Sequence, residues 1–351
     1  MARLLDQRSG RPPGRPAMPA LTAGLTVALS VGVLGGGCKP ELGAPPSLIA
    51  QPQVLDVRPS PPEAKPGAPV LLEPLLVDPT GTLAPPVAWT TCLTPKPPAE
   101  SNAVSITCVE QPDDDAPPVV GPITLTVPAS ACSLFGPLTP PAQPGQPPIR
   151  PRDPDPTGGF YQPVRAAVRG QGGEAGGGDL LGFALIRITC DLANAPTDVA
   201  RAFKDPVTGY HANQAPSFEA VTVVDATGTS IVVAGPGQAG HAQADVAIRP
   251  GDSIELRASW PPEAAEVFPV FDPATRTLVD QREALRVSWF MTAGELLHDR
   301  TGREAIDPEA FSDNTWTAPG VDVATLVHFW VVLRDNRGGS DSLAFDLTVS
   351  P

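Results

Sequence analysis

The sequence lacks the motifs that identify several common enzyme classes. Its four histidines lie far apart, and no His-Glu-x-x-His motif of a zinc peptidase is present. There is no Gly-x-Ser-x-Gly nucleophile elbow of a serine hydrolase. The glycine-rich stretch at 170–178 leads to no lysine, which a phosphate-binding loop would require. We therefore expect a protein that is not an enzyme.

Aromatic residues are scarce, and acidic residues outnumber basic ones. Aromatic residues make up 5% of the chain, so most of them are needed in cores. Trp316 and Trp330 are our candidates for exposed rings that stack on a sugar. The formal net charge of −14 makes nucleic acid and anionic lipid surfaces poor partners.

The first 37 residues have the order of features that is typical of a secretory signal. Four arginines precede an apolar run from Ala20 to Leu34, which is followed by three glycines and Cys38. The run is shorter than the roughly 18 to 20 apolar residues of a membrane-spanning helix. We expect residues 1–37 to be a cleaved signal peptide, which places the rest of the chain outside the cytoplasm.

The three glycines and the cysteine resemble the lipobox of bacterial lipoproteins. The resemblance implies cleavage before Cys38, lipidation of its thiol and attachment to the membrane through the N-terminal lipid. The chain departs from the family pattern because Gly35 stands where a large aliphatic residue is usual, with Leu34 one position early. The alternative is an ordinary signal, a secreted protein and Cys38 as a spare thiol. Lys39 follows the cysteine in place of the aspartate that often retains lipoproteins in the inner membrane, which favours the outer membrane of the cell envelope.

The four remaining cysteines predict two disulfides. An even number of cysteines outside the cytoplasm is typical of disulfide pairing, and no pair has the Cys-x-x-Cys spacing of a zinc site. Three pairings are compatible with the sequence, and four buried free thiols are the other alternative. We favour Cys92 with Cys108 and Cys132 with Cys190, because the second bond closes the loop around the proline-rich stretch.

Strand-like runs predict an all-β fold of two antiparallel sandwich domains. Residues 38–50 are rich in proline and glycine and read as a flexible tether. Short runs separated by turn formers indicate a first domain at 51–190 with a Pro/Gly-rich insertion at 137–180. The expected strands are 54–58, 70–77, 87–92, 104–108, 123–127, 160–168 and 181–190. Residues 191–216 are expected to form a linker with a short helix over 195–204.

The second predicted domain, 217–351, has clearer strand patterns. Apolar and polar residues alternate over 254–260, 285–291 and 343–349, which is typical of half-buried strands. The segment 326–333 is apolar on both faces, so we expect a central strand covered on both sides. Trp330 would then be covered by a long loop or by the first domain.

The last hairpin resembles that of PKD-type and related bacterial immunoglobulin-like domains. Residues 327–349 read as strand, Arg-Asp-Asn-Arg-Gly-Gly turn and strand, and Trp289 fits the core tryptophan of a third strand. Residues 314–319 fit the strand opposite it. The chain lacks the Trp-Asp-Phe-Gly-Asp-Gly signature of PKD domains and has Phe-Met-Thr-Ala-Gly after Trp289. The resemblance therefore implies the immunoglobulin-like sandwich, shared by a wider group of domains.

One acidic loop is a candidate for calcium, the only cofactor that the sequence suggests. Its carboxylates are Asp299, Glu304, Asp307 and Asp313, all between two expected strands of the second domain. The leading functional prediction is a non-catalytic cell-envelope lipoprotein that acts in adhesion, envelope organisation or binding of envelope proteins. The alternatives are a surface protein that binds carbohydrate, such as a polysaccharide, or a calcium-dependent ligand, and an enzyme with no recognisable motif.

Overall fold

The computed structural model describes residues 44–97, 103–112, 117–136, 144–145, 159–170, 178–192, 195–224, 228–237, 242–243 and 246–351. Residues Ala44–Pro351 form one compact unit. The predicted signal peptide, the predicted lipidation site Cys38 and most of the predicted 137–180 insertion lie outside the described residues. Within the described residues, no helix has the length and apolar character to cross a membrane.

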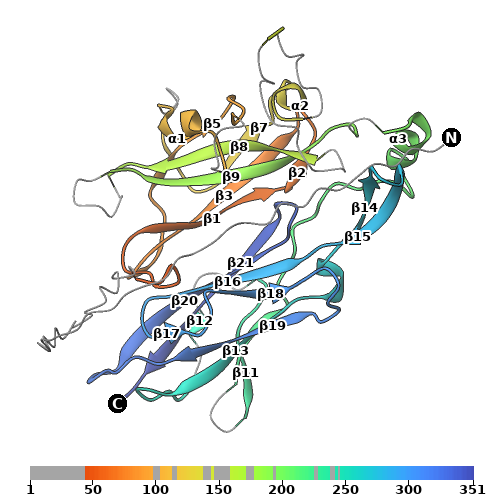
Figure 1. Ribbon diagram of the computed structural model, residues 1–351. Helices are drawn as coiled ribbons and strands as arrows, with labels where there is room; N and C mark the ends of the chain where they lie inside the picture. Colours follow the sequence, from red (N-terminus) through yellow and green to blue (C-terminus); the bar gives the residue numbers. More distant parts are fainter. Residues whose placement is uncertain are drawn as a thin grey trace, which may run out of the picture. The chain divides into compact units, whose positions relative to one another are not determined.

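The first half of the unit is a sandwich of two sheets (Figure 1). One sheet has the order β1-β3-β4, and β7 also pairs with β3. Its strands are β1 (Gln53–Ser60), β3 (Pro69–Asp78), β4 (Gly81–Leu83) and β7 (Ile123–Thr126). The other sheet has the order β2-β9-β8-β5-β6. Its strands are β2 (Glu63–Ala64), β5 (Pro86–Thr91), β6 (Val119–Val120), β8 (Gly159–Val168) and β9 (Leu180–Thr189).

Alternating apolar residues hold these two sheets together. Successive strand residues face opposite sides of a sheet, so Ala184, Ile186 and Ile188 of β9 all lie in the core, as do Val70 and Leu72 of β3. The predicted strands at 54–58, 70–77, 87–92, 123–127, 160–168 and 181–190 are confirmed to within one or two residues.

The predicted strand at 104–108 is wrong, because this segment begins the short helix α1 (Ile106–Glu110). The hydroxyl of Ser105 accepts a hydrogen bond from the backbone N–H of Thr107 and so caps the helix N-terminus. This local hydrogen bond competes successfully with the weak strand tendency of the segment. A second short helix, α2 (Ala131–Leu134), carries Cys132.

The connection between the halves contains the predicted short helix. It is α3 (Thr197–Phe203), which ends in Phe203, and the ring of Phe203 stacks on that of Tyr210 with centroids 4.8 Å apart.

The second half is another sandwich of two sheets. The first sheet has the order β11-β10-β13-β19-β17, and the second has the order β12-β21-β20-β16-β18. The first contains β10 (Ala220–Val224), β11 (Ser230–Ala234), β13 (Ser253–Ser259), β17 (Glu295–Leu296) and β19 (Phe311–Thr317). The second contains β12 (Ala242–Gln243), β16 (Leu285–Met291), β18 (Arg300–Arg303), β20 (Thr325–Arg334) and β21 (Ser340–Val349).

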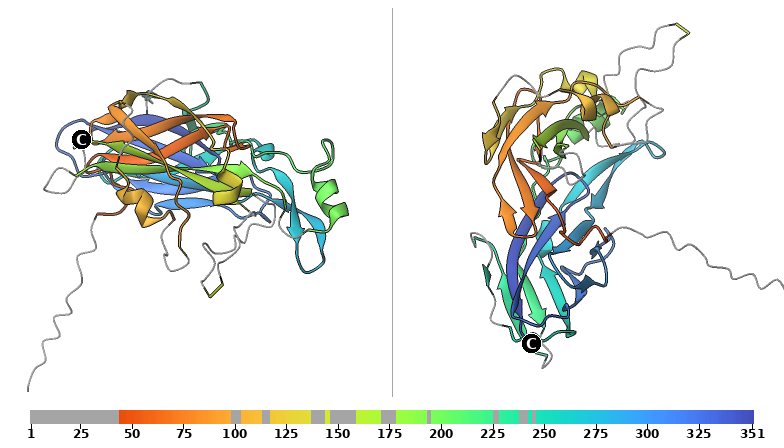
Figure 2. Two further views of the ribbon diagram at one scale, coloured as in Figure 1. Left: turned by 90° about the horizontal axis from the view of Figure 1, so that it is seen from above. Right: turned by 90° about the vertical axis from the view of Figure 1, so that its left-hand side faces the viewer.

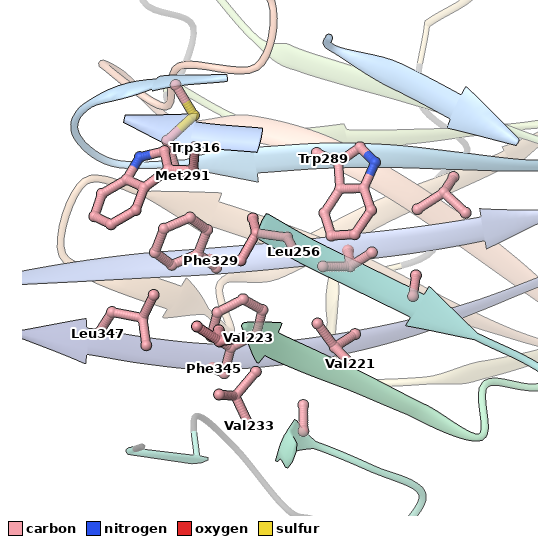
Figure 3. Close-up of a cluster of buried hydrophobic side chains, with 14 of the residues drawn as sticks. Val221, Val223, Val233, Leu256, Trp289, Met291, Trp316, Phe329, Phe345 and Leu347 are labelled. Carbon is pink, nitrogen blue, oxygen red and sulfur yellow. The ribbon is translucent and has the colours of Figure 1, made fainter. Parts of the chain in front are cut away.

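The core of the second sandwich lies between these sheets (Figure 3). Trp289 of β16 and Trp316 of β19 enter it from opposite sheets, and Phe329 of β20 stacks on Phe345 of β21. The predicted last hairpin is confirmed, since β20 and β21 pair antiparallel along their whole length. Both halves are therefore antiparallel sandwiches of the predicted immunoglobulin-like kind. Among the described named strands, only the two-residue strands β2 and β12 pair in parallel.

A separate two-stranded hairpin follows β13. It consists of β14 (Val267–Asp272) and β15 (Thr277–Arg282) and comes after the 3-10 turn Pro262–Ala264. In the views of Figure 2 this hairpin extends away from the sheets and runs beside α3. Its base places Glu266 and Glu283 next to one another, because the backbone N–H of Glu283 donates to the carbonyl of Glu266 over 2.9 Å.

The end of the predicted tether is not free. Residues 44–50 were expected to be flexible, but Leu48 forms a β-bridge with Met291 at the end of β16. The backbone N–H of Ile49 donates to the carbonyl of Met291 over 2.8 Å, and the Ile49 side chain is buried. Leu48 and Ile49 attach this segment to the sheet, because the end of β16 offers unpaired backbone groups.

Trp330 joins the two halves of the unit. β20 lies between β16 and β21, as predicted for a central strand, and its Trp330 points away from the core of its own sandwich. The ring packs against Ile49, Leu55 and Val77 in a separate buried cluster. The Trp330 Nε1 donates a hydrogen bond to Thr82 Oγ1 over 3.0 Å. The first half therefore covers Trp330, which is one of the two predicted arrangements.

Candidate functional site

Buried charges from both sandwiches meet the connection between them. The ionic cluster consists of Glu63, Arg187, Tyr210, Glu283 and Arg337. β2 and β9 supply the first two, and the connection supplies Tyr210. The last two come from the base of the β14–β15 hairpin and from the β20–β21 turn. The carboxylates of Glu63 and Glu283 are completely buried, and the guanidiniums of Arg187 and Arg337 are nearly so.

Glu63 is the acceptor at the centre of this cluster. Its Oε2 accepts a hydrogen bond from the hydroxyl of Tyr210 over 2.7 Å and another from the backbone N–H of Asn213 over 2.9 Å. Its Oε1 accepts from the hydroxyl of Thr189 over 2.9 Å. The Nε of Arg187 lies 3.3 Å from Oε2. A buried carboxylate needs several donors to replace water, and strands and connection together provide them.

Arg337 is the corresponding donor. Its Nη2 donates to the hydroxyl oxygen of Tyr210 over 2.6 Å and to the backbone carbonyl of His211 over 3.1 Å. Its Nη1 donates to Glu283 over 3.1 Å and to Glu266 over 3.3 Å. The guanidinium also lies over the ring of Phe268 from β14, 4.2 Å from the centroid. The planar fork of arginine suits this number of simultaneous contacts.

The carboxylates around Arg337 outnumber its single positive charge. Burial and the nearby Asp335 raise the pKa of Glu283 to about 8, although Arg337 acts in the opposite direction. Burial also raises the pKa of Asp335, against hydrogen bonds from the side chain of Asn213 and the backbone N–H groups of Gly339 and Arg337. Part of the negative charge in the cluster is therefore removed by protonation near neutral pH.

A second set of polar contacts joins β1 to the last hairpin. Asp56 accepts hydrogen bonds from Arg334 over 3.1 Å and from the hydroxyl of Ser340 over 2.6 Å. Arg58 of the same strand contacts Asp341 over 3.3 Å. Together with Trp330 and the ionic cluster, these contacts make a continuous polar and apolar attachment between the two sandwiches.

A pocket of about 550 Å³ lies on the connection side of the first sandwich. The segment after β2, helix α2, the end of β9, the end of α3 and the connection surround it. Its described lining residues are Lys65, Pro66, Cys132, Thr189, Cys190, Asp191, Phe203, Lys204 and Tyr210. Tyr210 belongs to both the pocket and the ionic cluster, because it is a lining residue of the pocket and its hydroxyl bonds to Glu63 and Arg337.

The wall of the pocket combines apolar surface with charge. The stacked pair Phe203 and Tyr210 forms one side. Both cysteines of the Cys132–Cys190 disulfide also line the pocket. At the rim, Lys204 Nζ lies 2.6 Å from Asp191 Oδ1, and both groups are exposed to solvent. Lys65 is also exposed, and none of the described residues forms an ion pair with it. This composition is that of a binding pocket for a small group.

Both predicted disulfides are present in the structure. Cys92 is bonded to Cys108 and Cys132 is bonded to Cys190, which is the pairing favoured from the sequence.

The prediction that Trp316 and Trp330 offer exposed rings is wrong. Both side chains are 0% exposed. Trp316 lies in the core of the second sandwich, where its Nε1 donates to the carbonyl of Ala293 over 3.0 Å, and Trp330 lies beneath the first sandwich. With so few aromatic residues in the chain, the cores use the largest ones, because burial of a large ring contributes most to stability.

The predicted calcium ligands do not converge on one point. Asp313 pairs with Arg257 at 2.7 Å, Glu304 with Arg286 at 3.1 Å and Asp307 with Arg303 at 3.3 Å. The backbone carbonyl of Asp299 accepts from the N–H of Trp289. No group of three or more carboxylate, histidine or cysteine side chains in the described part of the chain is arranged to hold a metal ion. Arg257, Arg286 and Arg303 pair with the carboxylates of Asp313, Glu304 and Asp307, so these groups are satisfied without a metal ion.

Sequence reasoning missed the ionic cluster. Arg187 alternates with buried apolar residues in β9, so its position predicts the wet face of a half-buried strand. Arg337 lies in a turn, where charged residues usually face water. The one usable signal was Tyr210, an aromatic residue in a segment otherwise read as a linker.

The described architecture defines the class of this chain as an all-β protein with two immunoglobulin-like sandwiches in one compact unit. No protein-family model and no curated protein matches the sequence. Among solved structures, it is similar to the D0-D1 domain of intimin at 10% identity, over 85% of this chain and 99% of that chain, with a TM-score of 0.20. It is also similar to dimeric latent PorU from Porphyromonas gingivalis at 10% identity, over 86% and 34% of the two chains, with a TM-score of 0.19. TM-scores this low support no argument about function.

Proposed function

We propose that this chain is a lipid-anchored protein of the cell envelope that binds a partner without catalysing a reaction. The observation that carries the proposal is the pairing of Cys92 with Cys108 and of Cys132 with Cys190. Disulfides persist in oxidising compartments and are rare in the cytosol. This agrees with the signal-like N-terminus and with lipidation at Cys38, for which the outer membrane is the favoured location.

The contacts between the sandwiches support a role in binding rather than catalysis. Arg337 donates to both Glu63 and Glu283, and all three side chains also bond to fixed neighbours, as groups that hold a structure together do. A catalytic group needs access to a substrate, and these side chains are fully or almost fully buried. Trp330 and the ionic cluster attach one sandwich to the other, so the protein presents a surface of fixed geometry to its partner. A preformed surface loses little conformational entropy on binding.

The test is the intact mass and membrane partitioning of the native protein beside a Cys38→Ser variant. We expect cleavage before Cys38, a mass increase of lipid size and recovery in the membrane fraction, all lost in the variant. Two or three acyl chains hold a protein firmly to a membrane. A freely soluble mature chain without added mass would overturn the lipid anchor, and a role in the secreted state would take its place.

A further inference from the structure

From the pocket next to the ionic cluster, we infer that this protein binds a carboxylate carried on an apolar group, as in the C-terminal residue of a peptide or a small aryl acid. This deepens the partner-binding part of the proposed function by naming the chemistry that the partner presents. The lipid anchor is a separate question, because binding in the pocket does not depend on acylation of Cys38.

The pocket has the size and lining for such a group. Its volume of about 550 Å³ lies within the roughly 300 to 1,000 Å³ of typical small-molecule sites. The stacked rings of Phe203 and Tyr210, the ring of Pro66 and the Cys132–Cys190 disulfide provide apolar surface. A single aromatic or branched aliphatic side chain can pack against this apolar surface and shield it from water.

The pocket wall is held in place before a ligand arrives. The hydroxyl of Tyr210 is fixed by Glu63 at 2.7 Å and by Arg337 at 2.6 Å. Phe203 is almost completely buried at the end of α3, and the disulfide ties α2 to the end of β9. A preorganised pocket of this kind binds its ligand with a small entropic cost.

Lysine in this chain is concentrated at the pocket. The whole sequence has only four lysines, Lys39, Lys65, Lys96 and Lys204, in a chain with a formal net charge of −14. Two of the four line this one pocket. Asp191 pairs with Lys204 at 2.6 Å, which leaves the ammonium of Lys65 as the charge available for a ligand. One free positive charge beside an apolar wall is complementary to a single carboxylate.

The experiment measures calorimetric binding of three probes to the mature chain that begins at Cys38. The probes are N-acetyl-L-phenylalanine, its uncharged amide and the peptide acetyl-Gly-Gly-Gly-Gly-Phe with a free C-terminal carboxylate. We expect both carboxylates to bind about fivefold or more tightly than the amide, since they alone pair with the ammonium. Equal binding of acid and amide, or no binding of any probe, would overturn the inference.

Three variants locate the binding site. Lys65→Gln should abolish the preference for the carboxylate, whereas Lys96→Gln, which removes a lysine that does not line the pocket, should leave it unchanged. Asp191→Asn should increase affinity for the carboxylates severalfold, because it frees Lys204. Loss of the preference in Lys96→Gln, or its retention in Lys65→Gln, would place the site elsewhere. Lys65 and Asp191 are exposed, so these variants should fold normally, which their thermal unfolding will verify.

The two carboxylate probes distinguish the source of the ligand. Tighter binding of the peptide than of N-acetyl-L-phenylalanine identifies a protein C-terminus, because the peptide makes additional contacts at the rim. Binding of N-acetyl-L-phenylalanine as tight as that of the peptide, or tighter, identifies a small aryl acid. Soluble behaviour of the native protein would overturn the lipid anchor without affecting either result.

Discussion

Glu63 and Arg337 are 274 positions apart in the sequence, and their side chains lie 3.5 Å apart in a buried site. Each also bonds to the hydroxyl of Tyr210 from the connection between the sandwiches. One carboxylate, one guanidinium and one phenol thus link the three main parts of the compact unit. The connection therefore acts as part of the structure and not as a flexible linker.

Removal of Arg337 should strongly destabilise the protein. We expect Arg337→Gln to lower the free energy of unfolding by about 3 to 5 kcal/mol, because it leaves buried carboxylates without their positive partner. The matched control is Arg286→Gln, whose pair with Glu304 is exposed and should contribute less than about 1 kcal/mol. Chemical denaturation measures both. An equal, small effect of the two substitutions would show that the cluster does not stabilise the fold.

The charge of Glu283 should make stability depend on pH. Its pKa is raised from 4.5 to about 8 by burial and by Asp335, so the folded state holds this proton more tightly than the unfolded state does. The stabilisation is complete below about pH 4.5 and is lost as the pH rises to 8 and above. Glu283→Gln cannot ionise and should show a smaller decline in unfolding free energy between pH 5 and 8.5.

The slope with pH is the measurement that matters for Glu283→Gln. If the amide of the glutamine fits the site less well, the unfolding free energy falls by the same amount at every pH, so its slope with pH is unchanged. Glu304→Gln serves as the control, since Glu304 is exposed and its removal should leave the wild-type slope in place. A Glu283→Gln slope identical to that of the wild type would mean that Glu283 stays ionised across this range.

Trp330 should contribute more to stability than an ordinary outward-facing strand residue. We expect Trp330→Ala to cost on the order of 3 to 5 kcal/mol, because it opens a cavity between Ile49, Leu55 and Val77. Thr82→Val should cost about 1 kcal/mol, because the buried Trp330 Nε1 loses the acceptor at 3.0 Å. Leu326→Ala on the same strand, 44% exposed, is the control for a simple loss of apolar surface. Similar effects of Trp330→Ala and Leu326→Ala would contradict the attachment of the two sandwiches through this ring.

The longer disulfide loop should stabilise the protein more than the shorter one. The Cys132–Cys190 bond spans 58 positions and the Cys92–Cys108 bond spans 16. In the chain-entropy model, closing these loops stabilises the folded protein by about 4 and 3 kcal/mol, respectively. Double serine variants at each pair, compared by thermal unfolding, measure the difference. A larger loss for the Cys92–Cys108 pair would show that local contacts around α1 outweigh loop entropy.

Much of the fold could be predicted because its signals are local. Alternation of apolar and polar residues identified β13, β16 and β21, and an uninterrupted apolar run identified the central strand β20. Side chains alternate between the two faces of a strand, so a strand with one buried face shows alternating apolar and polar residues in its sequence. The cysteine count together with the N-terminal signal predicted two disulfides, and the position of the proline-rich stretch between Cys132 and Cys190 favoured the pairing that is present. The failure at α1 also has a local cause, since a capping serine outweighed a weak strand pattern.

The candidate site was decided by tertiary structure. The sequence alone predicted two antiparallel sandwiches and two disulfides, and it contains few lysines. Only the folded unit brought Lys65 and Lys204 to one pocket and buried Arg187 and Arg337. Trp330, which was expected to bind a ligand, instead packs between the two sandwiches. A charged residue reads the same in sequence whether it faces water or a partner far along the chain. Its burial depends on which distant carboxylates and backbone groups the topology places beside it.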